Sequence, residues 1–234
     1  MRNIVECVSV VKDYGSIRAL DNINLQIPDD GGIVGLLGPN GSGKTTFIKL
    51  ITGLLAPTYG EVRVAGRPVG VESKSVVSYL SDFYSLVDSY TVTQELAYFE
   101  DFFVDFDREK AEKMIADLGI NPKQKVKTLS KGTKEKLALV LTLSRRAKLF
   151  VLDEPIAGVD PAARDYVLNT ILAGKDKDAT MIISTHLISE IEQYFNHIVF
   201  LKEGRVVLSG KADEIREREG KTIDELFREV FRWI

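Results

Sequence analysis

Residues 33–55 read IVGLLGPNGSGKTTFIKLITGLL, and this stretch decides the fold. The apolar residues at 33–37 predict a buried strand, and the apolar positions after residue 46 predict a helix. Between them, residues 38–45 match the pattern G-x-x-x-x-G-K-[S/T]. Backbone N–H groups of such a loop surround a triphosphate without obstruction from side chains, and the following helix turns its positive end toward the same phosphates. A chance glycine turn is the alternative, but the flanking strand and helix favour a nucleotide site.

The side chains at the end of this loop have separate expected tasks. Lys44 should reach the β and γ phosphates of a bound triphosphate, and the hydroxyl of Thr45 should ligate Mg²⁺. The other expected nucleotide contacts come from the loop and the first helical turn: Gly38, Pro39, Asn40, Gly41, Ser42, Gly43 and Thr46. The loop alone predicts a nucleotide with Mg²⁺, but it does not say which reaction follows.

A second apolar run, predicted to be a buried strand over 149–152, ends in Asp153 and Glu154. Ligands of open α/β sheets bind at the carboxyl ends of strands. Asp153 is therefore expected in the Mg²⁺ shell. Glu154, which points the other way in an extended strand, is expected to polarise a water molecule for attack on the γ phosphate. An ordinary strand-to-turn junction is the alternative, which the phosphate loop makes the weaker one.

A third apolar strand, predicted over 180–184, is followed by His186, one of two histidines. A histidine at the tip of a strand beside Asp153 and Glu154 can touch the γ phosphate and report its presence. The alternative is a histidine with a purely structural role, which is how we interpret His197. Glu154, His186 and Lys44 are the expected catalytic residues.

The rest of the chain predicts an α/β fold. Residues 4–27 form short runs of Val, Ile and Leu, which indicate an antiparallel β subdomain. From 91 to about 129 the pattern turns helical, which indicates a helical subdomain inserted at about 92–145. Alternating strands and helices elsewhere predict a P-loop core built on a mainly parallel sheet with covered faces. We expect one ATPase domain over 1–210.

Residues 211–234 are expected to form a C-terminal helical tail. Thr222 and Glu225 fit a capping box at the start of a helix. One apolar stripe follows at helical spacing: Ile223, Leu226, Phe227, Val230, Phe231 and Ile234. The stripe predicts a helix packed on its own domain or, alternatively, a contact with a partner.

Composition limits the possible functions. The chain has 234 residues, of which 44% are hydrophobic, so it can bury a sizeable core. Its 31 basic and 34 acidic residues nearly balance, and we therefore expect no nucleic-acid partner. The single cysteine, Cys7, excludes a disulfide framework and a multi-cysteine metal site. Early charges argue against a signal peptide, and the apolar runs fall far below the ~20 residues of a membrane helix. We expect a cytoplasmic chain.

These motifs together resemble the ATP-binding cassette family, the nucleotide-binding subunits of ABC transporters, over residues 1 to about 210. The resemblance implies that Tyr14 stacks on adenine, at the spacing from Gly38 that is typical of the family. It implies that Asp160, in the sequence Val-Asp-Pro after the catalytic glutamate, communicates across a dimer of cassettes. His186 matches the switch histidine of the family.

Residues 128–133, TLSKGT, occupy the place of the family signature, normally Leu-Ser-Gly-Gly-Gln. In that family, the signature of one subunit closes over ATP bound to the phosphate loop of a second subunit. Ser130 and Gly132 are kept, and the resemblance implies that both contact that nucleotide. Lys131 and Thr133 depart from the pattern, and this departure bears on the rate of hydrolysis more than on nucleotide binding.

The family also has a glutamine between the two halves of the site, and here Asp82 matches that position. An aspartate can still ligate Mg²⁺ through a hard oxygen. A solvated turn residue is the alternative.

Aromatic residues follow, and they predict either core of the helical subdomain or a groove for a helix of a membrane subunit: Phe83, Tyr84, Tyr98, Phe99, Phe102, Phe103 and Phe106. The lysines from 123 to 136 indicate a solvated face or a site near anionic lipid.

The resemblance implies an ATPase that couples Mg-ATP-driven closure of two cassettes to movement of a separate membrane permease. It further resembles the ATPases of bacterial ABC-2 type exporters, which would place the chain at the cytoplasmic face of the membrane through the permease. The second cassette could be a copy of this chain or a different one. Two alternatives stay open: a nucleotide switch outside transport, and a poorly hydrolysing cassette in a heterodimer.

Overall fold

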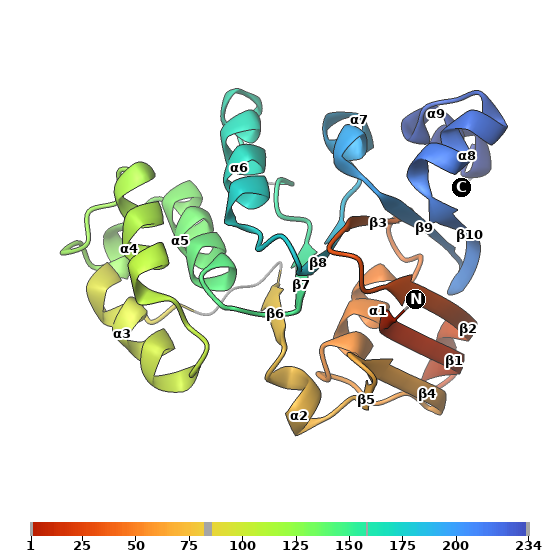
Figure 1. Cartoon of the computed structure of the whole chain (residues 1–234), viewed down its shortest axis with the longest axis horizontal. Coiled ribbons are helices and arrows are strands. Elements are labelled where there is room, and N and C mark those ends of the chain that lie inside the picture. The colour runs from red at the N-terminus through yellow and green to blue at the C-terminus, as the bar shows by residue number, and fades with distance from the viewer. Residues whose placement is uncertain (1, 82–85, 158, 233–234) are drawn as a thin grey trace.

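A computed structural model of the chain describes residues 2–81, 86–157 and 159–232 (Figure 1). Its largest sheet has the strand order β10-β9-β3-β8-β7-β6 in these residues. The strands from β9 to β6 pair in parallel, and β10 pairs antiparallel with β9. Their bounds are β3 Ile33–Leu37, β6 Val77–Leu80, β7 Leu149–Asp153, β8 Thr180–Ser184, β9 His197–Lys202 and β10 Arg205–Lys211. The mainly parallel sheet predicted from the sequence is confirmed.

Side chains of the central strands alternate between two cores, one on each face of this sheet. In β7, Phe150 and Leu152 face one core, whereas Leu149 and Val151 face the other. This alternation follows from the two-residue repeat of a strand, and it explains why the strands are continuously apolar in the sequence. The first core is covered by helices: α6 Pro161–Gly174, α7 Ile188–Ile191, α8 Ala212–Glu219 and α9 Ile223–Val230, with the short 3-10 helix η2 Glu192–Tyr194 after α7.

The second core is closed by α1 Lys44–Ile51 and by an antiparallel sheet with the strand order β2-β1-β4-β5. The antiparallel strands are β1 Asn3–Tyr14, β2 Ile17–Pro28, β4 Tyr59–Val64 and β5 Arg67–Pro68, and the short helix α2 Val71–Lys74 follows them. Figure 1 shows this sheet at the lower right, beneath α1. The antiparallel subdomain predicted for residues 4–27 is therefore confirmed, and β4 and β5 extend it.

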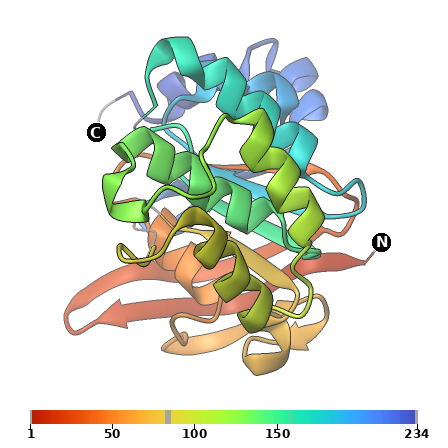
Figure 2. The same cartoon turned by 90° about the vertical axis from the view of Figure 1, so that its left-hand side faces the viewer.

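The helical lobe is formed by α3 Val92–Phe102, α4 Arg108–Asp117, the 3-10 helix η1 Val126–Thr128 and α5 Lys131–Leu143. Figure 2 shows these helices in front of the sheets, at one end of the molecule. Helix α5 packs on both sides, because Leu137, Val140 and Leu141 face the lobe core while Leu139 and Leu143 face the first core of the large sheet. Its position is therefore fixed by the lobe core and by the first core of the large sheet together.

The predicted aromatic cluster divides between the interior and the surface of the lobe. Phe99 and Phe106 pack against the lobe core, whereas Tyr98 and Phe102 are 44% and 69% exposed. The rings contact one another, with centroids 5.8 Å apart for Tyr98 and Phe102. Phe83 and Tyr84 lie outside the described residues.

The apolar stripe of the C-terminal helix packs on its own chain. Ile223, Leu226 and Phe231 are buried in the first core, and the rings of Phe227 and Phe231 lie 5.7 and 5.8 Å from the ring of Phe200 on β9. The predicted capping box of Thr222 and Glu225 is present at the start of α9. Ile234 lies outside the described residues. Of the described helices, none is both long and apolar enough to cross a membrane.

Glu95 of α3 is a buried acid in the lobe, with its side chain fully covered. Its Oε1 accepts a hydrogen bond from the backbone N–H of Val87. Its Oε2 has no hydrogen-bond partner in the part of the chain that the structure describes. Burial raises the pKa of this carboxyl above 4.5, and the bond from Val87 opposes the shift.

Glu95→Gln is expected to stabilise the protein at neutral and alkaline pH but not at acidic pH. The pKa of Glu95 is higher in the folded than in the unfolded chain, so its contribution to the free energy of unfolding is fully present below the unfolded pKa. That contribution is lost as pH rises through the folded pKa. Each unit of the shift corresponds to about 1.4 kcal/mol of unfolding free energy. Urea unfolding across a pH series measures the difference, with Glu100→Gln on the exposed face of α3 as the control. A difference between Glu95→Gln and wild type that does not vary with pH would contradict the expectation.

Candidate functional site

The phosphate loop joins β3 to α1 through a backbone that needs glycine at defined points. A Cβ at Gly38 would lie 2.4 Å from both the carbonyl oxygen of Leu201 and Oγ of Ser42. Gly43 has φ +105°, and a Cβ there would lie 2.8 Å from the carbonyl oxygen of Ala19. Because side chains at these positions would collide with neighbouring backbone, the loop can close tightly at the start of α1. The predicted strand, glycine loop and helix are all present.

The donors of the loop fit a triphosphate. Oγ of Ser42 is buried and has no hydrogen-bond partner among the described residues. Nζ of Lys44 donates to the carbonyl oxygens of Gly38 and Pro39, at 2.7 and 3.2 Å. Burial lowers the pKa of Lys44, while Glu154 and Asp153 raise it. A buried hydroxyl without a partner and a buried ammonium at a helix N-terminus are a donor set that phosphate oxygens would satisfy.

The remaining loop residues face outward. Asn40, Gly41 and Thr45 are exposed, and Pro39 and Thr46 are half-buried. Thr45 belongs to the first turn of α1, next to Lys44. Its hydroxyl is therefore available to a ligand that approaches the loop from solvent.

Asp153, the last residue of β7, is buried and pairs in the sheet with Ser184 of β8. Oγ of Ser184 donates to Oδ1 of Asp153 at 2.5 Å and accepts from the backbone N–H of Glu154 at 3.0 Å. The same N–H of Glu154 also donates to the carbonyl oxygen of Ser184, at 3.1 Å. Ser184 therefore joins the two acidic residues, a role that the sequence reasoning missed. The signal was a hydroxyl residue at the end of an otherwise apolar strand.

The prediction that Glu154 continues an extended strand is wrong. The strand β7 ends at Asp153, and Glu154 has φ +52°, in the left-handed region. A residue other than glycine is strained there, and surrounding contacts must hold it. The two hydrogen bonds from its N–H to Ser184 are contacts of this kind. The different directions of the two carboxylates thus follow from a turn and not from the alternation of a strand.

His186 lies beside Glu154. Nδ1 of His186 is 2.9 Å from Oε2 of Glu154, and the backbone N–H of His186 lies 3.4 Å from the same oxygen. The imidazole is 54% exposed, whereas the Glu154 side chain is only 17% exposed. His197 instead pairs with Asp30, with Nε2 to Oδ2 at 2.7 Å, away from this site.

The loop, the two acids and His186 meet at one edge of the large sheet. The loop follows β3, His186 follows β8, Asp153 ends β7 and Glu154 comes directly after it. These strands are neighbours in the order β3-β8-β7, and they run in parallel. Their carboxyl ends therefore lie side by side, as binding sites of open α/β sheets require.

Within residues 128–133, Ser130 is the N-cap of α5. Its Oγ accepts a hydrogen bond from the backbone N–H of Thr133 at 3.2 Å. Ser130, Lys131 and Gly132 are exposed at this helix end. They line a cavity of about 550 Å³ together with Asp153, Glu154 and Asp160. Among the described residues, none of the phosphate loop lines it. Within one chain, residues 130–133 therefore share a cavity with Asp153 and Glu154, whereas the described residues of the phosphate loop do not line that cavity.

Tyr14 ends β1 and is 45% exposed. Nζ of Lys12 lies 5.3 Å from the centroid of its ring and donates to the carbonyl oxygen of Ala56 at 2.9 Å. The ammonium of Lys12 thus makes a cation–π contact with one face of the ring, and the exposed part of the ring is accessible to a flat ligand. Asp82, the expected counterpart of the family glutamine, lies outside the described residues.

Replacing Ser184 by alanine is expected to lower the free energy of unfolding by about 2 kcal/mol, because a buried hydrogen bond to a charged group is lost. Thermal or urea unfolding measures this change. Thr170→Ala is the matched control, because this half-buried residue of α6 donates its hydroxyl to a carbonyl oxygen of its own helix, at 2.8 Å, and to no other group among the described residues. Equal stabilities of Ser184→Ala and Thr170→Ala would contradict the expectation.

Comparison with known proteins agrees with this geometry. The family model described as ABC transporter matches residues 20–157. The uncharacterized ABC transporter ATP-binding protein YhaQ of Bacillus subtilis is 30% identical over 217 residues, which cover 91% of this chain and 72% of the relative. The Nod factor export ATP-binding protein I of Cupriavidus metallidurans is 29% identical over 227 residues, covering 94% of this chain and 75% of the relative.

A solved structure, described as an ATP-binding subunit of an ABC transporter, superposes with a TM-score of 0.86. It is 27% identical, and the match covers 97% of this chain and 98% of that one. The expected α/β cassette with its β and helical parts is confirmed. The chain belongs to the ABC transporter family, as one of its ATP-binding subunits.

Proposed function

We propose that this chain hydrolyses Mg-ATP at an interface between two cassettes, and that closure and reopening of the pair drive a separate membrane subunit. The observation that carries the proposal is the group of residues at the carboxyl ends of the neighbouring strands β3, β8 and β7. It holds a phosphate-binding loop, a histidine and two acidic residues joined by Ser184.

The nucleotide contacts divide between the base and the phosphates. Tyr14 stacks on adenine, and the backbone N–H groups of residues 40–46 with Nζ of Lys44 bind the β and γ phosphates. Thr45 and Asp153 would hold Mg²⁺, with Asp82 as a further oxygen ligand. When bound, Mg²⁺ neutralises charge on the phosphate oxygens.

Hydrolysis needs a base close to the γ phosphate. The carboxylate of Glu154 accepts a proton from water as the water oxygen attacks the γ phosphorus, and the bond from that phosphorus to the bridging oxygen of ADP breaks. His186 holds the carboxylate of Glu154 through the contact at 2.9 Å. Lys44 donates to the phosphate oxygens as their negative charge changes.

A second cassette completes the site. Ser130 and Gly132 are exposed at the N-terminus of α5, and Asp160 is exposed just before α6. A helix N-terminus with free backbone N–H groups attracts an anion. We propose that these residues contact the ATP held by the phosphate loop of the other subunit, and that Lys131 adds a positive charge there.

The membrane subunit contacts the helical lobe in this proposal. Tyr98 and Phe102 form an exposed aromatic surface on α3, and Val104 beside them is fully exposed. Aromatic residues of this kind are favoured at the centres of protein interfaces. The chain would then lie at the cytoplasmic face of the membrane, held by its permease. A relative named for Nod factor export supports export as the direction.

The test of the proposal is association driven by nucleotide. With Mg²⁺ and a slowly hydrolysed ATP analogue, the solution mass of the wild-type chain should shift from monomer to dimer. Ser130→Glu should bind the analogue with unchanged affinity but stay monomeric, because a carboxylate at the start of α5 repels the γ phosphate. Arg63→Ala, on the exposed face of β4, is the control that should dimerise like wild type.

Two other results would separate the remaining alternatives. Binding of the analogue without association of the wild-type chain would show that closure needs a different cassette or the membrane subunit. Absence of analogue binding and of phosphate release from ATP would overturn the proposal.

A further inference from the structure

The end of the β1–β2 hairpin carries Tyr14 and has an irregular backbone. Tyr14 pairs with Ile17 and Asp13 pairs with Arg18, across a two-residue turn. The register between the strands shifts on both sides of Lys12. A ladder interrupted in this way bends and does not by itself fix the direction of the hairpin end. Other contacts must therefore set the position of the Tyr14 ring.

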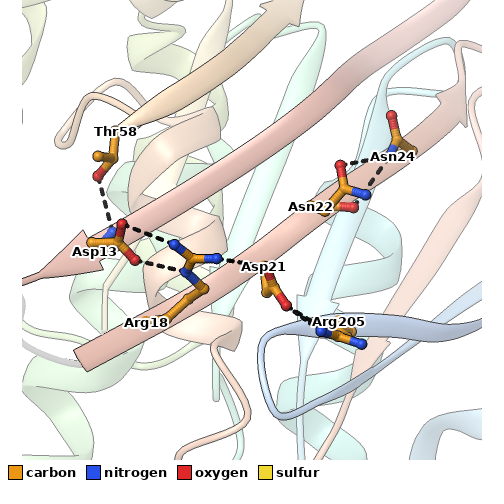
Figure 3. Close-up of polar contacts among 7 residues, drawn as sticks. All are labelled: Asp13, Arg18, Asp21, Asn22, Asn24, Thr58 and Arg205. Atoms are coloured by element: carbon orange, nitrogen blue, oxygen red, sulfur yellow. Dashed lines mark hydrogen bonds and ion pairs between the residues drawn. The ribbon is translucent and has the colours of Figure 1, made fainter. Parts of the chain in front are cut away.

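Side chains make those contacts in a group that we name the Asp21 network: Asp13, Arg18, Asp21 and Arg205 (Figure 3). Nε of Arg18 donates to Oδ1 of Asp13 at 3.0 Å, and Nη1 of Arg18 donates to Oδ1 of Asp21 at 3.2 Å. Nε of Arg205 donates to Oδ2 of Asp21 at 2.8 Å. Each oxygen of Asp21 thus receives a different guanidinium.

Both acids of the network are more covered than their partners. The side chains of Asp13 and Asp21 are 23% and 20% exposed, against 53% for Arg18 and 69% for Arg205. The backbone N–H of Asp13 also donates to Oγ1 of Thr58, at 2.9 Å, which ties the residue before Tyr14 to the approach to β4. Arg205, followed by Arg18, lowers the pKa of Asp21.

The same Asp21 is connected to the phosphate loop through backbone. Its N–H donates to the carbonyl oxygen of Gly204 at 2.9 Å, and the N–H of Gly204 donates to the carbonyl oxygen of Ser42 at 3.0 Å. The packing is close, because a Cβ at Gly204 would lie 2.7 Å from the carbonyl oxygen of Ala19. Asp21 is therefore bonded through Gly204 to the loop and through Arg18 to the residue next to Tyr14.

We propose that Asp21 is a positioning residue for the nucleobase, which fixes the distance between the ring of Tyr14 and the phosphate loop. The inference rests on the proposed function, because it takes Tyr14 as the adenine contact. A ligand held by its base and by its phosphates requires this distance to be set before binding, since ordering a mobile contact lowers affinity.

The Asp21 network is not explained by a contribution to the free energy of unfolding. Ion pairs at this degree of exposure contribute little to folding, because water and salt screen them. Their geometric effect is separate, since the two guanidiniums hold Asp21 between the hairpin end and the β9–β10 turn. Loss of the network should therefore change ATP affinity more than it changes unfolding.

The experiment is a double-mutant cycle on ATP affinity. The dissociation constant for Mg-ATP is measured by titration calorimetry for the wild type, Asp21→Asn, Tyr14→Ala and the double variant. Asp21→Asn keeps the backbone bond to Gly204 but removes the charge that both arginines bind. It should weaken ATP binding roughly three- to tenfold in the presence of Tyr14, and less than about twofold in Tyr14→Ala.

Arg205→Ala should shift ATP affinity in the same direction, and Arg63→Ala, which breaks an exposed pair with Glu61 on β4, should not. Urea unfolding of each variant shows that its fold is intact. An equal effect of Asp21→Asn with and without Tyr14, or no effect, would overturn the inference while leaving the proposed function standing. Absence of ATP binding by the wild type would instead overturn the proposed function.

Discussion

Replacing Glu154 by glutamine is expected to lower the rate of ATP hydrolysis by a factor of about 10² to 10⁴, the usual contribution of a positioned general base. The amide cannot accept the proton of the attacking water. Affinity for Mg-ATP should be kept, because the phosphate loop, Lys44 and Asp153 are unchanged. Phosphate release under saturating ATP measures the rate, and titration calorimetry measures the affinity.

The backbone of Glu154 makes this variant informative. Its left-handed conformation is held by two hydrogen bonds from its N–H to Ser184, and glutamine keeps both. The side-chain amide can also keep a hydrogen bond to Nδ1 of His186. The substitution thus removes the base with little change of shape. Glu61→Gln, on the exposed face of β4, is the control and should hydrolyse ATP at the wild-type rate. Hydrolysis by Glu154→Gln at the wild-type rate would exclude Glu154 as the base.

Replacing Lys44 by alanine is expected to weaken ATP binding by about 30-fold or more, because a buried, hydrogen-bonded partner of a charged group typically contributes 2 kcal/mol or more to binding. The ammonium already lies against the loop, 2.7 Å from the carbonyl oxygen of Gly38. Displacement of a fluorescent ATP analogue by ATP measures the affinity.

Lys49→Ala is the matched control for this variant. Lys49 lies in the last turn of the same helix, α1, and its side chain is exposed. It should bind ATP like wild type. Because burial lowers the pKa of Lys44, removal of its ammonium also relieves a desolvated charge, and Lys44→Ala should fold normally. Unchanged affinity in Lys44→Ala would contradict the assignment of the loop.

Local patterns in the sequence predicted much of the fold correctly. The strand before the loop, the helix after it and the apolar strands at β7, β8 and β9 follow from hydrophobic periodicity and glycine placement. The capping box of Thr222 and Glu225 was readable because its two members are three residues apart. The proximity of His186 to Glu154 was expected because parallel strands end at one edge of a sheet.

The position of the exposed aromatic residues was only partly predictable. A run rich in Phe and Tyr marks the lobe, but the sequence left open which rings face its core. Phe99 is packed inside and Phe102 is exposed because α3 turns one face toward α4 and α5. Asp82 stays a prediction, since it lies outside the described residues.

The sequence by itself determined the α/β class, the phosphate loop and the identity of the two acids at the end of β7, because each depends on residues close together in the chain. Tertiary structure alone decided that Ser184 joins Asp153 to Glu154, that Glu154 turns into a left-handed conformation, and that Asp21 binds Arg205 across 184 residues of sequence. Such contacts depend on which strands become neighbours and in which register. That choice is made by burial of the whole set of apolar faces, and no local pattern contains it.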